Sequence, residues 1–556
     1  MTTIDTRPDA ADSAVDGAVG GSALVPFFVG VAAWVTTTDH KRIGRLYASA
    51  GLVALLVTAV LGLMLGIERA GDGAVLEPNA LLQIFQAYRV GLVFAVVIPL
   101  GLGLAIAAVP LQLGARSIAF PRLALTGFYA WLGGLSLTMA ALGRNGGIGG
   151  GDRQAVELFL VGHGLMILGL LASAGCVATS VLTTRAPGMT MRRVPLFAWS
   201  ALVGALGMLL ALPVVFGVVV YAFLDHRYAQ LNFGGAEGIG LWLGWAFSVP
   251  AVVVYALPAV GVAAELMPVT FRSRQALRGV AFAGIALVGV TALAATTQQY
   301  VFDVTIDTDG TTFLEGAVPF LVFAGLPLLG ILVVIGLGGL TAGTGLAAGR
   351  PRITAPFVFS FLGLGMVVVG VVGNFAIGIT DLELIGTVAE EGATLYVVYG
   401  AALAVIGGLL FWAPKLWGRT VPDTQALPLA LVGVAGTVLA ALPLYVAGFL
   451  DQAGGVPASD ADVAALIDLG GVDQGALWNT LSLLGHGLMG LTVVAVVGLM
   501  AKTFTGAGAA ADDNPFGAHT IEWSTSSPAP AHNFEHLPTV ASPEPLFDTV
   551  LEGSTS

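Results

Sequence analysis

The chain has 556 residues, of which 56% are of apolar types and only 10% are charged. Average soluble domains carry about 25% charged residues, so this composition excludes a soluble enzyme, a nucleic-acid-binding protein and a disordered chain and predicts a membrane protein. The formal net charge is −12 and only three basic residues are Lys, which argues against a polyanionic partner and is typical of halophilic proteins adapted to high salt.

The chain divides into three parts. Residues 1–36 are a polar N-terminal segment that ends in a short apolar stretch, 24–35, which is too short to cross a membrane and is expected to lie at the interface. Residues 37–504 are the predicted membrane domain, and residues 505–556 are a Pro-rich tail with too few apolar residues to form a core of its own.

The membrane domain contains a series of apolar runs, each long enough for a transmembrane helix of about 20 residues. Twelve such runs lie near 45–67, 85–113, 122–143, 154–184, 194–224, 240–266, 276–300, 315–347, 355–380, 394–418, 427–451 and 475–504. The predicted fold class is therefore all-α, a polytopic bundle of twelve transmembrane helices.

The distribution of basic residues predicts the orientation. Of the 22 Lys and Arg residues, 17 lie in the N-terminal segment and in alternate loops. Positive charge collects on the cytoplasmic side of a membrane, so we expect a multi-pass plasma-membrane protein with both termini in the cytoplasm.

Several long motifs follow one another along the chain. They are WVTTTDHKRIGRLY (34–47), AVPLQLGARSIAFPRL (108–123), TTRAPGMTMRRVPLFAWS (183–200), GGLLFWAPKLWG (407–418) and WNTLSLLG (478–485), followed by the tail. In these motifs the chain resembles subunit I of the haem-copper oxidases, the cytochrome c oxidase subunit I family. The resemblance implies a twelve-helix bundle of the respiratory chain that holds two haems and a copper, reduces dioxygen and pumps protons.

The family's metal ligands are six His residues, and this chain departs from the family at those places. The corresponding positions are Tyr88, Val249, Gln298, Gln299, Gly392 and Thr394. The amide side chains of Gln298 and Gln299 are poor copper ligands compared with imidazole, and Val249 is apolar. We therefore expect no copper, no protein-bound metal and no catalytic residue, and either no cofactor or at most a single haem.

Two His residues do lie at membrane depth. His163 and His486 each sit in the pentapeptide GHGLM, at 162–166 and 485–489. One hypothesis is a haem held by both His residues, or a quinone site, between the fourth and twelfth spans. The alternative is that the two His residues form hydrogen bonds between helices in Gly-rich packing.

Three charged positions carry weaker predictions. Arg89 either fills the room of the low-spin haem together with Tyr88 or extends to the outer interface. Glu265 is expected to be an interfacial anchor, and the pair Glu390–Glu391 is expected in a loop.

These observations favour a subunit I-like scaffold, a non-catalytic pseudo-enzyme within a respiratory complex. Its expected partners are membrane lipid and other respiratory subunits, which would contact the cytoplasmic tail and the bundle surface. Two alternatives stay open: a terminal oxidase subunit in aerobic electron transport with relocated haem ligation, and a channel or transporter that reuses the vacated cavities.

Overall fold

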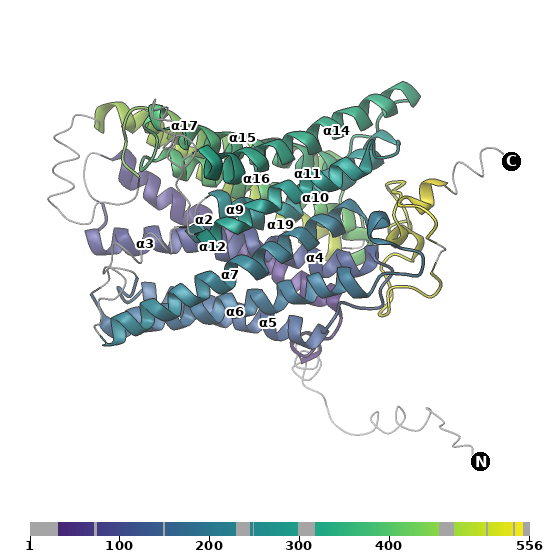
Figure 1. Cartoon of the computed structure of the whole chain (residues 1–556), viewed down its shortest axis with the longest axis horizontal. Helices are drawn as coiled ribbons and strands as arrows, with labels where there is room; N and C mark the ends of the chain where they lie inside the picture. Colours follow the sequence, from purple (N-terminus) through teal and green to yellow (C-terminus); the bar gives the residue numbers. More distant parts are fainter. Residues whose placement is uncertain are drawn as a thin grey trace, which may run out of the picture.

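The computed structural model describes residues 32–71, 75–147, 151–228, 245–247, 249–297, 317–454, 472–506, 510–537 and 540–548. Within these ranges the chain is helical apart from its connections and the tail, and the one β-bridge pairs Thr387 with Ala453. The long helices lie side by side along one direction (Figure 1).

Ten helices of the described chain are long and apolar enough to cross a membrane. Two shorter apolar helical stretches, Leu257–Phe271 and Arg278–Leu293, overlap the sixth and seventh predicted runs. The prediction of an all-α membrane bundle is thus confirmed. The helices are α2 (His40–Ala70), α3 (Pro78–Val90), α4 (Ile98–Gln112), α5 (Pro121–Leu142), α6 (Arg153–Thr183), α7 (Leu196–Tyr228), α9 (Val249–Tyr255), α10 (Leu257–Phe271), α11 (Arg278–Gly289), α12 (Ala294–Thr297), α14 (Leu326–Ala348), α15 (Ala355–Ile377), α16 (Ala389–Trp417), α17 (Asp423–Gly448) and α19 (Val472–Thr505).

The second span is one helical segment, Pro78–Gln112, with a π-helical stretch at its centre. This stretch, η1 (Gly91–Val97), begins at a glycine whose position leaves room for the Thr58 hydroxyl of α2. The indole nitrogen of Trp131 donates a 2.8 Å hydrogen bond to the carbonyl oxygen of Phe94 within η1. A π-helical turn widens the helix locally, and such turns often occur at functional sites.

Glycine allows neighbouring helices to pack closely. A Cβ atom at Gly134 of α5 would lie 2.3 Å from the backbone nitrogen of Met166 on α6, and one at Gly363 of α15 would lie 2.5 Å from the carbonyl oxygen of Gly400 on α16. Contacts this short require small residues, as in other membrane helix pairs. They account for part of the high glycine content of 77 residues.

Two helical segments form the centre of the bundle. The most apolar windows of Pro78–Gln112 and of α16 are completely buried inside the protein, whereas those of the other long helices are 39–61% buried. The peripheral helices therefore present part of their surface to lipid. Residues placed on the two central segments, such as Tyr88 and Thr394, lie inside the protein.

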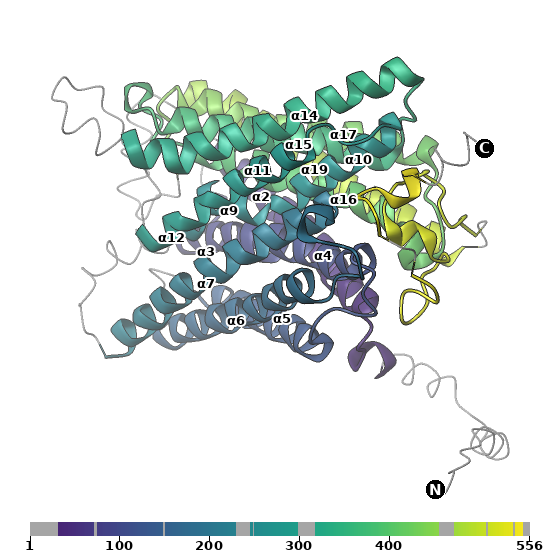
Figure 2. The ribbon, with the colours of Figure 1, turned by 45° about the vertical axis from the view of Figure 1, so that its right-hand side comes forward.

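The tail packs on one end of the bundle, at the right of Figure 1 and in front in Figure 2. The ammonium group of Lys41, at the start of α2, donates to the carbonyl oxygen of Pro530 and to the side chain of Asn533, both at 3.1 Å. The ring of His40 also contacts Asn533, at 3.0 Å. The start of the membrane domain and the tail thus lie at the same end of the bundle, as an even number of spans requires.

Lys415, near the end of α16, holds a second part of the tail. Its ammonium group donates to the carbonyl oxygens of Asp513 (2.8 Å) and Thr525 and to the hydroxyl of Ser527 (3.2 Å). It also lies over the Trp523 ring. Lys415 is completely buried, so the tail supplies the polar partners that this cation needs.

Three expectations on boundaries and burial differ from the structure. The sixth span consists of two helices, α9 and α10, which meet at Ala256, two residues before Pro258. Glu265 is no interfacial anchor: it is buried, and its carboxylate accepts a 3.1 Å hydrogen bond from the backbone of Phe197. Glu390 and Glu391 form the first turn of α16 rather than a loop.

Candidate functional site

A buried ion pair lies at the end of the bundle opposite the tail. Arg69, in the last turn of α2, pairs with Glu391, in the first turn of α16, at 2.8 Å. Their side chains are only 16% and 12% exposed. Each end of the pair suits its helix, because a cation at a helix C-terminus and a carboxylate at an N-terminus both oppose the helix dipole.

Two side-chain amides lie next to the backbone of Arg69. The side-chain nitrogen of Asn479, on α19, donates to the carbonyl oxygen of Arg69 at 3.1 Å and faces the side chain of Gln452 at 3.3 Å. The carbonyl oxygen of Gln452 accepts in turn from the backbone nitrogen of Val388, directly before α16. The ion pair is thus part of a polar network that joins α2, α16 and α19.

Tyr88 and Arg89, on α3, lie beside the ion pair. With Glu391 and Thr394 they line a small cavity, with a volume of about 10 Å³, that is closed by Leu92, Val93 and Phe247. A guanidinium nitrogen of Arg89 donates to the carbonyl oxygen of Phe247 at 3.5 Å, and the group lies over the Phe247 ring. Arg89 therefore lines the interior beside Tyr88, as one of its two predicted placements required.

His486 completes the cluster from α19. Its Nδ1 atom shares a 2.8 Å hydrogen bond with the hydroxyl of Tyr399 on α16. The rings of Tyr88 and Tyr399 each meet the imidazole edge-on, with centroids 5.9 and 5.8 Å away. Gly62 of α2 gives the imidazole its room, since a Cβ atom there would lie 2.6 Å from the ring. We call Arg69, Tyr88, Glu391, Tyr399 and His486 the outer cluster, because they lie away from the tail, towards the opposite end of the bundle.

His163 lies in a different environment, on α6. Its neighbours are the rings of Phe94, Phe159 and Phe247, with centroids 4.9, 5.6 and 6.3 Å away. Its Nδ1 atom is buried and has no hydrogen-bond partner among the described residues. No hydrogen bond or ring contact in the described chain joins His163 directly to His486.

The other ligand positions of the resemblance lie in α9, α16 and the segment after α12. Val249 is the first residue of α9, and the buried residues Ala251, Val252 and Val253 follow it. Gly392 packs towards α17, because a Cβ atom there would meet the carbonyl oxygen of Ala441 at 2.9 Å. Gln298 and Gln299 lie outside the described residues.

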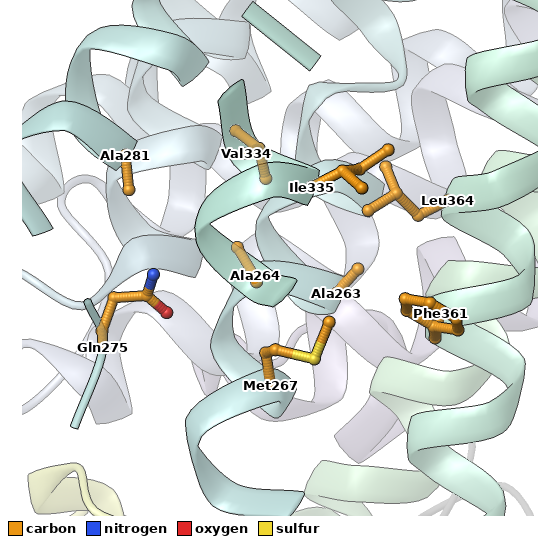
Figure 3. A pocket seen from close by; sticks show the side chains of 10 residues that line it. Ala263, Ala264, Met267, Gln275, Ala281, Val334, Ile335, Phe361 and Leu364 are labelled. Atoms are coloured by element: carbon orange, nitrogen blue, oxygen red, sulfur yellow. The ribbon is translucent and has the colours of Figure 1, made fainter. Parts of the chain in front are cut away.

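A second cavity is apolar. It lies between α10, α14 and α15, with Met267, Val334 and Phe361 among its lining residues, and Gln275 is its one polar side chain (Figure 3). It contains no titratable group, so it offers little for catalysis. The outer cluster is the better candidate for a functional site.

The tail end of the bundle carries buried titratable groups outside the membrane spans. The carboxylate of Glu522 accepts from the side chains of Trp412 (3.2 Å) and Gln112 (3.3 Å). Burial raises the pKa of Glu522, although these hydrogen bonds act in the opposite direction. Burial and the nearby Arg274 lower the pKa of His519 to about 4, so His519 is neutral when the tail is in place.

The sequence also matches a known family model. The model described as Cytochrome C and Quinol oxidase polypeptide I matches residues 42–488. The chain belongs to this family. It is 30% identical over 548 residues to the putative cytochrome c oxidase subunit 1-beta of Streptomyces avermitilis, which covers 93% of this chain and 91% of that protein.

Further relatives agree. Cytochrome c oxidase subunit 1 of Bacillus subtilis is 28% identical over 534 residues, which cover 92% of this chain and 82% of that protein. Among solved structures, a haem-copper terminal oxidase dimer determined by cryo-electron microscopy has a TM-score of 0.62 at 14% identity, covering 92% of this chain and 89% of that one. This likeness shows a shared fold.

The family corrects our expectation on cofactors. We expected no cofactor, or a single haem without copper. That expectation is wrong: the family, its cytochrome c oxidase relatives and the haem-copper oxidase neighbour point to a cofactor-binding oxidase subunit.

The residues at those positions do not fit the family's ligand set. The described side chains of Tyr88 and Thr394 line the small cavity of the outer cluster and offer hydroxyl oxygens rather than imidazole nitrogens. Within the described chain, no group of three or more His, Cys, Asp or Glu residues is arranged to hold a metal ion. We therefore derive no reaction step through a haem or a copper ion.

Sequence reasoning missed the main members of the outer cluster. Arg69 was not singled out and Glu391 was expected in a loop, yet they form the central ion pair. A usable signal existed: both residues lie within one turn of a strongly apolar run, where a charge is costly unless it has a partner.

Proposed function

We propose that this protein is a subunit I-like membrane component of a respiratory haem-copper oxidase-type complex and acts there as a structural, non-catalytic paralogue. The family match over residues 42–488 supports the first part.

The outer cluster carries the proposal. At the position where the resemblance expects a low-spin haem and its ligand, Tyr88 packs between His486 and the Arg69–Glu391 pair. These side chains come from α2, α3, α16 and α19. Such a network favours a fixed helix arrangement, which is what a structural subunit needs.

The residues at the start of α9 support the same view. At the places where the resemblance implies a proton-carrying Glu and a Tyr, this chain has Ala251 and Val253, both buried. Neither side chain has an ionisable group, so neither can pass a proton during oxygen reduction.

We also propose that both termini face the cytoplasm and that the tail contacts neighbouring subunits. The basic residues of the alternate loops support this orientation. Fusion of a reporter after residue 556 tests it: a fluorescent protein that folds only in the cytoplasm should be active, and a phosphatase that folds only outside should be inactive. The reverse pattern would overturn the orientation.

The functional test compares assembly with catalysis. The tagged chain, purified in mild detergent, should bring other oxidase subunits with it, and cells lacking it should contain less of the complex. Oxygen consumption per assembled complex should stay at the wild-type level in a Glu391→Gln variant that still assembles. A purified chain that consumes oxygen from a reduced donor without other subunits would refute the structural role.

A second candidate function is a catalytic oxidase subunit with relocated haem ligation. The buried, unpartnered Nδ1 atom of His163 favours it, since a free imidazole nitrogen is what haem iron binds. A His163→Ala variant that loses a haem absorption band present in the wild type would support it. The remaining alternative, a channel or transporter, predicts solute or proton flux in liposomes without an electron donor.

A further inference from the structure

Two arginines at the start of α2 lie close together beside two tryptophans. The guanidinium groups of Arg42 and Arg45 both lie over the ring of Trp34, at 5.7 and 5.5 Å from its centroid. Arg45 also lies 5.6 Å from the ring centroid of Trp417, at the end of α16. We call Trp34, Arg42, Arg45 and Trp417 the basic-aromatic patch.

Within the part of the chain that the structure describes, no carboxylate forms an ion pair with either of these cations, Arg42 and Arg45. The carboxylate that acts on Arg45 belongs to Asp39, and Asp39 already pairs with Lys41 at 3.0 Å. Neighbouring like charges repel each other, so the patch favours an anion from outside the chain.

Hydrogen bonds and ring stacking hold the side chains of the patch in place. The Nε atom of Arg45 donates to the carbonyl oxygen of Lys41 at 3.2 Å, and Arg42 donates to the carbonyl oxygen of Ala33 at 3.3 Å. Trp417 stacks on Phe504 of α19 with ring centroids 4.4 Å apart. The contacts hold both guanidinium groups near the end of the α2–α19 pair.

Exposed apolar side chains follow the arginines along the helix. On α2, Val53 comes eleven residues, about three helical turns, after Arg42 and so lies on the same face, and Val57 lies about one turn further on; they are 62% and 52% exposed. On the neighbouring α19, Leu491 and Val494 are 60% and 51% exposed. In a membrane protein such a surface faces acyl chains.

We propose that the basic-aromatic patch binds the phosphate of an anionic phospholipid whose acyl chains lie along the exposed faces of α2 and α19. Arginine suits this role because its planar group donates to two phosphate oxygens at once. Tryptophan is typical of the membrane interface, where its ring meets both headgroup and acyl chain. A phosphate there would supply the negative charge that Arg42 and Arg45 lack.

The test measures lipid binding to the full-length protein in detergent. Lipid-depleted protein is titrated with dioleoyl phosphatidylglycerol or dioleoyl phosphatidylcholine, and bound lipid is counted by native mass spectrometry. Each basic residue near a membrane surface adds about 1 kcal/mol of attraction to anionic lipid. We therefore expect Arg42→Gln/Arg45→Gln to weaken phosphatidylglycerol binding about tenfold or more, with phosphatidylcholine binding unchanged.

Two control variants separate the site from general charge and from misfolding. Arg122→Gln removes an exposed arginine at the start of α5 and should leave phosphatidylglycerol binding at the wild-type level. Arg42→Lys/Arg45→Lys keeps the charge and should recover most of the binding.

Three outcomes would overturn the proposal. The first is equal binding of phosphatidylglycerol by the wild type and the Gln double variant. The second is inorganic phosphate alone binding as tightly as the lipid, because the acyl chains would then contribute nothing. The third is loss of an acidic partner subunit from the Gln double variant with lipid binding intact, which would assign the patch to a protein interface.

Discussion

Two buried cations, one near each end of the bundle, are stabilised in different ways. At the end opposite the tail, Arg69 meets an opposite charge, Glu391. At the tail end, Lys415 is surrounded by backbone carbonyls and a hydroxyl instead. The ion pair therefore holds two helices together, whereas the carbonyl groups around Lys415 hold the tail on the helices. Mutations at the two ends should therefore differ in size and in the part of the protein that they loosen.

Removal of one partner of the outer ion pair should have the largest effect. Glu391→Ala leaves the Arg69 cation buried without its partner, and such changes typically cost about 3–5 kcal/mol. Thermal unfolding in detergent should show a large drop in Tm. The double variant Arg69→Met/Glu391→Leu should recover most of it, because apolar side chains can replace a buried pair. A single variant as stable as the wild type would show that the pair does not hold the helices.

Loss of Lys415 should come next and should affect the tail rather than the helices. Lys415→Met removes hydrogen bonds from a charged donor, each contributing about 1.5–3 kcal/mol. We expect proteolytic cleavage within 510–537 to become much faster while the Tm of the bundle changes little. Lys502→Met, at an exposed position in the last turn of α19, is the matched control and should leave cleavage slow. Equal cleavage rates for all three proteins would contradict the anchoring role of Lys415.

A smaller effect is expected where α2 meets His486. In Gly62→Ala the new methyl group would lie 2.6 Å from the imidazole ring, so the ring must move away from Tyr399. Overpacking of this kind costs about 1–3 kcal/mol. Gly133→Ala is the control, since no atom lies within 4 Å of a Cβ atom there. The comparison would fail if both alanine variants had the same unfolding temperature.

The smallest effect is the pH dependence of tail docking through His519. Its pKa is about 4 in place of the ordinary 6.5, so its contribution is complete above pH 6.5 and is lost as pH falls towards 4. At pH 5.5 docking should be weaker by about 1 kcal/mol. Burial raises the pKa of Glu522 and Glu544, and this contribution has the opposite sign, since it is lost as pH rises.

The variant His519→Asn separates the two contributions. Tail cleavage in this variant should lose the part of the acid sensitivity that His519 causes, while His532→Asn, at an exposed position, should behave like the wild type. Wild type and His519→Asn with identical cleavage rates between pH 7 and pH 5 would contradict this assignment.

The helices were predictable because each apolar run can be recognised from a short stretch of the sequence. The predicted run 355–380 corresponds to α15, Ala355–Ile377, and the run 122–143 to α5, Pro121–Leu142. The division of the sixth span was not visible, since α9 and α10 have similar apolar composition on both sides of Ala256. Such a break depends on packing against neighbouring helices, which hydropathy does not record.

The candidate site was predictable only in part. Tyr88 and His486 were singled out from motif and membrane depth, and both lie in the outer cluster. Arg69 and Glu391 were not, because their pairing joins residues 322 positions apart, and no local pattern records such a contact. The docking of the tail had a signal in the sequence that was overlooked. Two of the three Lys residues, Lys41 and Lys415, lie in the quoted sequence motifs 34–47 and 407–418, and both are buried against the tail.

The most direct test of the structural role is oxygen consumption by the purified, tagged chain with a reduced donor. We expect no turnover above that of a mock preparation from cells lacking the chain, together with a complex whose amount falls when the chain is removed. Oxygen consumption by the chain alone, abolished by His163→Ala, would contradict the structural role and favour a catalytic subunit with relocated ligands.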